Sequence, residues 1–83
     1  MSERVMAYIL MRIQLGHTDD VLRKLREIEE TTRVAVTTGE YDVVMLVDVE
    51  SLEALYDITV NRIHKIPGIE ETTTAVVEKM ISV

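Results

Sequence analysis

The chain has 83 residues, with 9 Lys and Arg against 15 Asp and Glu and no cysteine, so its formal net charge is −6. A chain this short is expected to make one domain, residues 1–83, and small domains usually need a disulfide, a metal or a partner for added stability. The lack of cysteine excludes disulfides and thiolate metal sites, and the negative charge argues against nucleic-acid binding, which depends on Lys and Arg at phosphates.

The first part of the chain predicts a strand, a helix and a second strand. Residues 5–15 are rich in β-branched and long apolar side chains and end at Gly16, which is typical of a strand. Thr18 is expected to be the N-cap of the following helix. A second strand is predicted over residues 33–38, before a turn at residues 39–42. The helix is amphipathic, because apolar residues recur at helical spacing at Val21, Leu22, Leu25 and Ile28.

The second part of the chain predicts a strand, a helix and a final strand. Residues 43–49 begin with a continuous apolar run, and Ser51 or Glu50 is expected to cap the helix that follows. Pro67-Gly68 ends this helix, because proline cannot continue it and glycine tolerates the turn. The last strand is predicted over residues 69–80.

The order βαββαβ predicts an α+β fold, the ferredoxin-like sandwich, with both helices on one face of a four-stranded antiparallel sheet of order 4-1-3-2. Residues 5–11 and 43–47 are apolar at odd and even positions, as expected of central strands buried on two faces. Two helices cover only one face, so a second copy is expected to cover the other face, sheet to sheet, in a homodimer. That face is predicted to carry roughly Tyr8, Leu10, Val44 and Leu46, or the alternate residues of the same two strands.

The titratable side chains form no recognisable catalytic or metal-binding motif. His17 and His64 are interpreted as surface or cap residues, and adjacent positions in a strand are expected to send the Glu70 and Glu71 carboxylates to opposite faces. We therefore expect no metal, no cofactor and no catalytic residues. The interior between helices and sheet is predicted to be lined by Val21, Leu25, Ile28, Leu55, Tyr56 and Ile63.

Two segments admit either a structural or a binding interpretation. Gly39-Glu40-Tyr41-Asp42 has ordinary turn chemistry, but it also brings backbone N–H groups, a phenol and a carboxylate together, with Asp42 suited to an ammonium group. Thr72 and Thr74 are ordinary strand residues, yet they share one face, and paired hydroxyls suit a carboxylate or another polar group.

The succession of Gly39-x-Tyr41-Asp42, an apolar strand, a helix ending in Ile66-Pro67-Gly68-Ile69, and Thr72-x-Thr74 resembles the ligand-binding (RAM) domain of the Lrp/AsnC family. The resemblance covers residues 5–80. It implies a ferredoxin-like domain that dimerises through its sheets, with dimers assembled into octamers or decamers and amino-acid effectors bound between dimers. The residues that it places at the effector are Gly39, Tyr41, Asp42, Thr72 and Thr74.

Regulators of that family usually carry a helix-turn-helix domain before this module, whereas this chain begins at its first strand and so resembles a stand-alone form. The leading hypothesis is a non-enzymatic, amino-acid-binding oligomer that modulates full-length Lrp/AsnC regulators, without contacting nucleic acid or membrane. We expect it to be cytoplasmic, because the apolar run at residues 5–11 is shorter than the ~20 residues that span a bilayer.

Two alternatives remain open at this point. One is a small dimeric α+β barrel enzyme of the monooxygenase or isomerase type, although the predicted interior offers no His or carboxylate for acid–base work. The other is a structural assembly module that binds no ligand.

Overall fold

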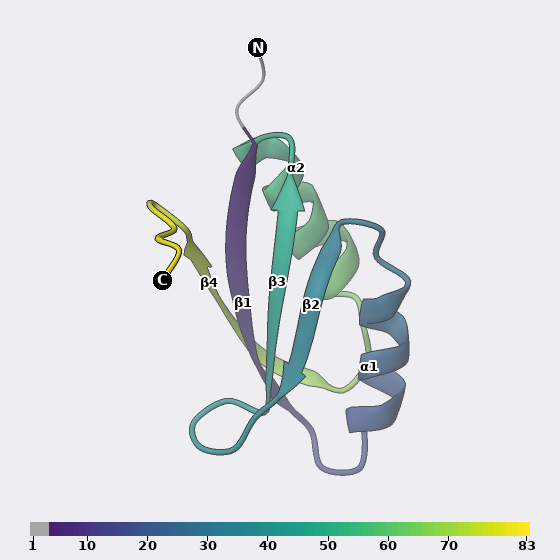
Figure 1. The fold of residues 1–83 in the computed structure, drawn as a ribbon. Helices are drawn as coiled ribbons and strands as arrows, with labels where there is room; N and C mark the ends of the chain where they lie inside the picture. The colour runs from purple at the N-terminus through teal and green to yellow at the C-terminus, as the bar shows by residue number, and fades with distance from the viewer. Residues whose placement is uncertain (1–3) are drawn as a thin grey trace.

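The computed structural model describes residues 4–83, which form a four-stranded antiparallel sheet with helices packed on one face (Figure 1). The sheet order is β2-β3-β1-β4, which is the predicted 4-1-3-2 order counted from the other edge. The predicted α+β, ferredoxin-like fold is therefore confirmed. In chain order the elements are β1 (Val5–Ile13), α1 (Thr18–Arg26), β2 (Thr31–Val36), β3 (Val43–Val49), α2 (Leu52–Asp57), the π-helical segment η1 (Ile58–Ile63) and β4 (Ile69–Val76).

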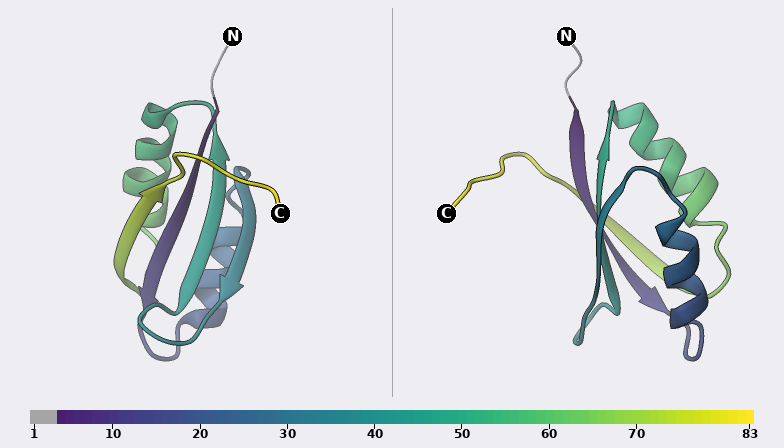
Figure 2. Two further views of the ribbon diagram at one scale, coloured as in Figure 1. Left: turned by 60° about the vertical axis from the view of Figure 1, so that its left-hand side comes forward. Right: turned by 45° about the vertical axis from the view of Figure 1, so that its right-hand side comes forward.

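The central strands β1 and β3 use their two faces differently. Their register places Ile9 opposite Met45 on the face that the helices cover, where both side chains are fully buried. Alternate residues point to the other face, where Tyr8 lies opposite Leu46 and Leu10 opposite Val44. Figure 2 shows both helices on one side of the sheet and the chain after β4 on the other. The structure thus decides between the two alternating sets that the sequence left open, and places Tyr8, Leu10, Val44 and Leu46 on the helix-free face.

The core lies between the sheet and the helices. All buried side chains among residues 4–83 are hydrophobic. One predicted interior residue is wrong: Tyr56 is 65% exposed, because Leu55 and Ile58, three residues apart, take the positions that face the sheet. The helices bury Val21, Leu25, Leu55, Ile58 and Ile63.

The two helices begin differently. In α2 the Ser51 hydroxyl accepts a hydrogen bond from the Ala54 N–H at 3.0 Å, so the predicted Ser51 cap is confirmed. The prediction that Thr18 caps α1 is wrong. The turn at residues 14–17 sets His17 at the N-cap, with no side-chain cap, and Thr18 is already the first helical residue.

The strands stop earlier than the apolar pattern suggested. β2 covers residues 31–36 rather than 33–38, because the N–H of Thr37 donates to the carbonyl of Asp42 at 2.9 Å and starts the loop. β4 ends at residue 76 rather than 80, one residue before a final hydrogen bond from the Val77 N–H to the Met6 carbonyl. β1 likewise ends at residue 13 rather than 15.

The second predicted helix is regular only in its first part. After α2 the chain widens into η1, whose end is marked by a hydrogen bond from the His64 N–H to the Thr59 carbonyl, five residues back, at 2.9 Å. Segments of π-helix are rare and frequently accompany functional sites. Within residues 4–83, no helix has the length and apolar character needed to cross a membrane.

Candidate functional site

The loop of residues 39–42 joins β2 to β3 and is closed by its own hydrogen bonds. Gly39 has φ = +111°, a region that glycine adopts without the strain felt by other residues. The Thr37 hydroxyl donates to the Tyr41 carbonyl at 2.8 Å. The segment therefore forms a turn, as its residue types indicate. If it also binds a ligand, it does so as a loop whose shape its own hydrogen bonds fix.

Asp42 anchors this loop to the end of β1. Its Oδ2 atom accepts a hydrogen bond from the Ile13 N–H at 2.8 Å, and its own N–H donates to the Met11 carbonyl at 2.9 Å. The residue is half-buried. One oxygen of the carboxylate that was predicted to face an ammonium group is thus already engaged within the chain.

Tyr41 lies beside β4, next to a threonine that sequence reasoning did not choose. The Tyr41 hydroxyl is 3.2 Å from the Thr73 hydroxyl. Thr73 lies opposite Leu10, on the helix-free face, whereas Thr72 and Thr74 lie opposite Met11 and Ile9, on the helix-covered face. Thr72 and Thr74 share a face as predicted. Within one chain, however, their side chains and Tyr41 lie on different faces of the sheet.

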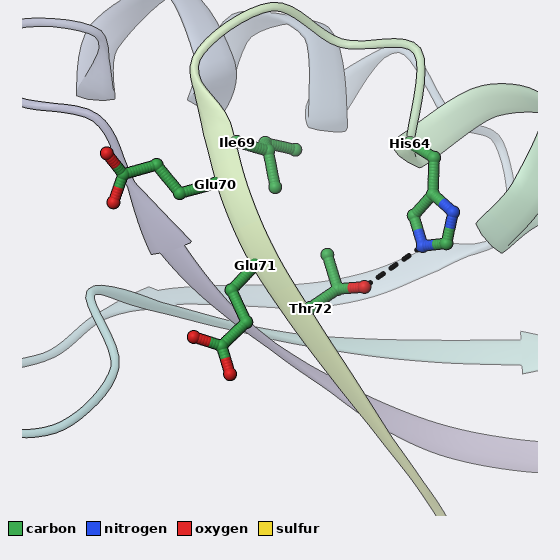
Figure 3. A pocket seen from close by; sticks show the side chains of 5 residues that line it. All are labelled: His64, Ile69, Glu70, Glu71 and Thr72. Carbon is green, nitrogen blue, oxygen red and sulfur yellow. Dashed lines mark hydrogen bonds between the residues drawn. The ribbon is translucent and has the colours of Figure 1, made fainter.

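Thr72 has a partner in His64, which is predicted to be only a surface or cap residue and is indeed the C-cap of η1. His64 follows η1 directly, and its Nε2 atom is 3.0 Å from the Thr72 hydroxyl oxygen, as Figure 3 shows. No local sequence motif predicts the contact between His64 and Thr72. It depends on the wider turns of η1 and on the position of His64 beside β4. A cavity of about 250 Å³ adjoins it, lined by His64, Ile69, Glu70, Glu71 and Thr72.

The two glutamates of this cavity do not alternate across the strand. Ile69 pairs with Ile13 and Glu71 pairs with Arg12, so Glu70 is an extra residue in a β-bulge. Both carboxylates lie on the side of β4 away from His64 and Thr72 (Figure 3). The prediction that they point to opposite faces is therefore wrong, since it assumed a regular strand. The Arg12 Nε atom lies 3.1 Å from Glu71 Oε1.

No metal centre is visible in the described part of the chain. Among residues 4–83, no group of three or more His, Cys, Asp or Glu side chains is arranged to hold an ion. The chemistry of the candidate site is therefore that of hydroxyls, one imidazole, carboxylates and backbone groups. Such groups recognise small polar molecules by hydrogen bonds and charge.

The helix-free face of the sheet carries a second cavity of different character. Its volume is about 380 Å³, and Arg33 is the only charged residue among those that line it. Tyr8 is 37% exposed and Val44 is half-buried, so large apolar side chains remain accessible on this face. The cavity is lined by Tyr8, Arg33, Ala35, Val44, Leu46 and Met80.

Several curated proteins similar to this chain are named as transcription regulators. The family model for the Lrp/AsnC ligand binding domain matches residues 6–82. The HTH-type transcriptional regulator FL11 of Pyrococcus abyssi is 35% identical over 75 residues, which cover 90% of this chain and 49% of that protein. The chain thus spans about half the length of the curated relatives that it matches.

Solved structures show the same fold. The hypothetical protein PHS023 from Pyrococcus horikoshii is 32% identical, with a TM-score of 0.84 and 92% of each chain covered. The Neisseria meningitidis regulator NMB0573, solved as an L-Met complex, has a TM-score of 0.89 over 95% of this chain and 53% of its own, and at 18% identity it shows the fold alone. The domain family that matches is one of regulatory, non-enzymatic domains that bind small effectors such as amino acids and oligomerise. With nearly its whole length matched, this chain belongs to the Lrp/AsnC ligand-binding domain family.

Proposed function

We propose that this chain is an amino-acid-binding, oligomeric module that modulates transcription regulators of its own family. The observation that carries the proposal is the hydrogen bond between Tyr41 and Thr73, which sets the loop of residues 39–42 beside the threonine segment of β4. These are the two segments at which the family resemblance places the effector. They are distant in sequence and adjacent in the fold.

The first step of assembly is a homodimer formed through the helix-free face. Tyr8, Leu10 and Val44 leave apolar surface accessible there beside the buried Leu46, and the helices cannot cover it because they pack on the other side. A second copy, packed sheet to sheet, removes that surface from water and avoids an aggregation hazard. Dimers then assemble into a closed ring, an octamer or a decamer.

The effector binds in the crevice between dimers. We assign its contacts to Gly39, Tyr41, Asp42, Thr72 and Thr74, contributed by neighbouring chains. Two chains are needed because, within one chain, the Thr72 and Thr74 side chains and Tyr41 lie on different faces of the sheet. The L-Met complex of the Neisseria regulator supports an amino acid as the ligand class for this fold.

Binding acts on assembly through linkage. An effector that contacts two dimers has a higher affinity for the assembled ring than for free dimers, so its occupancy favours the ring. The module acts in the cytoplasm through mixed assembly with full-length relatives. Its net charge of −6 disfavours direct contact with DNA phosphates, so DNA binding is left to those partners.

The test is a screen of the free amino acids at millimolar concentration, with thermal melting and mass-resolved size exclusion as readouts. We expect one amino acid, or a few related ones, to raise the melting temperature and shift the mass. Thr72→Ala and Thr74→Ala should weaken that response. Thr59→Ala is the control, because its hydroxyl bonds to the Tyr56 carbonyl away from β4. A ring that responds to no amino acid would instead support a ligand-free assembly module.

A further inference from the structure

The cavity beside the outer strand β4 is lined by two carboxylates, a hydroxyl and an imidazole, groups that suit the ammonium group of an amino acid better than its carboxylate. We infer that it binds the ammonium group, with the Thr72 hydroxyl oxygen as acceptor, His64 as the residue that orients this hydroxyl, and Glu70 as the source of negative charge. The inference rests on the proposed function for the ligand class. It adds two residues to the site and assigns the ligand's direction.

The hydrogen bond between His64 and Thr72 determines what the hydroxyl offers to a ligand. If the hydroxyl donates its proton to an unprotonated Nε2, both lone pairs of the oxygen remain free to accept hydrogen bonds. If Nε2–H is the donor instead, the hydroxyl proton turns away from the ring and one lone pair is already used. An ammonium group has three donors and no acceptor, so it is complementary to the first arrangement.

The charge of the cavity favours the same end of the ligand. Two carboxylates line it, and that of Glu71 is paired with Arg12 at 3.1 Å. Glu70 makes no ion pair within residues 4–83. The lining therefore keeps a net negative charge that attracts a cation and repels a carboxylate. Because Glu70 lies across the strand from Thr72, it acts through its field rather than by contact (Figure 3).

This direction reverses the expectation that Asp42 faces the ammonium group and the threonines face the carboxylate. Asp42 Oδ2 accepts a hydrogen bond from the Ile13 N–H, so one oxygen of that carboxylate is committed to holding the loop. The ammonium group goes to β4 instead.

Fragment binding followed by NMR tests the direction without knowledge of the natural effector. Methylammonium chloride and sodium acetate are titrated separately at pH 8 and constant ionic strength. We expect methylammonium to shift the amide signals of Glu70, Glu71 and Thr72, and acetate to leave them unchanged. Ring ¹⁵N shifts should show His64 as the Nδ1–H tautomer. Acetate binding at these residues, or an Nε2–H tautomer, would overturn the inference.

Variants separate the orienting role of His64 from a merely structural one. His64→Phe should weaken methylammonium binding about fivefold, the effect of losing the one neutral hydrogen bond that orients the Thr72 hydroxyl, while His64→Gln, which keeps an acceptor, should restore most of it. Glu70→Gln should weaken it by about threefold. Glu53→Gln, an exposed acid in α2, is the matched control.

The two proposals fail in distinguishable ways. If no amino acid binds but methylammonium still shifts the β4 signals, the proposed function is wrong and the cation site stands. If an amino acid binds equally well to the wild type, His64→Phe and Glu70→Gln, the ammonium assignment is wrong and the proposed function stands.

Discussion

The Oδ2 atom of Asp42 lies 2.8 Å from the backbone nitrogen of Ile13, so a loop residue terminates the first strand. The N–H of the same aspartate donates to the carbonyl of Met11. One residue thereby satisfies backbone groups where β1, β3 and the 39–42 loop meet. We call this meeting point, formed by Asp42 with Met11 and Ile13, the Asp42 corner. It fixes the geometry of the 39–42 loop, on which the proposed binding site depends.

Replacing Asp42 should therefore lower stability. Asp42→Ala leaves the half-buried Ile13 N–H without its acceptor, and we expect a loss of about 1–2 kcal/mol in the free energy of unfolding. Asp42→Asn keeps a carbonyl oxygen and should lose less than Asp42→Ala. Urea denaturation measures both, with exposed Glu40→Ala in the same loop as the control. An Asn variant as unstable as the Ala variant would show that the charge, rather than the acceptor, holds the corner.

Two glycines with similar backbone angles should respond differently to alanine. Gly16 has φ = +86° and Gly68 has φ = +99°, so alanine at either position is strained by about 1–2 kcal/mol. A Cβ at Gly68 would also lie 2.6 Å from the Cβ of His17, whereas a Cβ at Gly16 meets nothing within 4 Å. Gly68→Ala should therefore be the more destabilising in chemical denaturation. Equal losses would mean that the 14–17 turn moves aside at no cost.

The order of the strands and the division of each central strand into two alternating sets of residues could be predicted, because they follow from apolar content and alternation. Tyr8 and Leu46 share a face because residues of a regular strand alternate, but strands that are apolar at every position do not reveal which face the helices cover. Where the backbone departs from regularity, that reasoning fails. The bulge at Glu70 and the π-helical turns before His64 shift side chains without any mark in the hydrophobic pattern.

The contacts within the candidate site were the least predictable part of the structure. That Thr72 and Thr74 share a face follows from the strand period. The contacts of Tyr41 with Thr73 and of His64 with Thr72 depend instead on how different elements pack together. The two residues of each pair are 32 and 8 positions apart in the sequence. No spacing rule for a single element can supply such contacts.

The helix caps offer a direct comparison of two hydroxyl residues. Ser51→Ala removes the acceptor of the Ala54 N–H and should cost about 1 kcal/mol of the free energy of unfolding. Thr18→Ala should change stability by less than about 0.5 kcal/mol, because this hydroxyl caps nothing and α1 has no side-chain cap. Urea denaturation of the two variants gives the comparison. A larger loss at Thr18 would contradict the assignment of His17 as the N-cap.

The helix-free face provides the test of the proposed dimer. Leu10→Glu places a carboxylate at the centre of that face, on β1 and opposite Val44, where a second copy would have to desolvate it. We expect the mass measured by light scattering to fall from that of the dimer, or of a larger assembly, to that of the monomer. Leu15→Glu adds the same charge at a side chain that is 97% exposed in the turn after β1, and it should leave the mass unchanged.

These two leucine variants also separate the interface from a general effect of charge on solubility. If both dissociate the assembly, repulsion between acidic chains, rather than burial of the face, controls association. If neither does, the sheet face is not the dimer interface, and Tyr8, Leu10 and Val44 must be covered in another way. Only loss of the dimer in Leu10→Glu alone, with far-ultraviolet circular dichroism unchanged, agrees with sheet-to-sheet packing. That outcome would place the first assembly step on the face opposite the helices and leave the outer edge of β4 free for contacts between dimers.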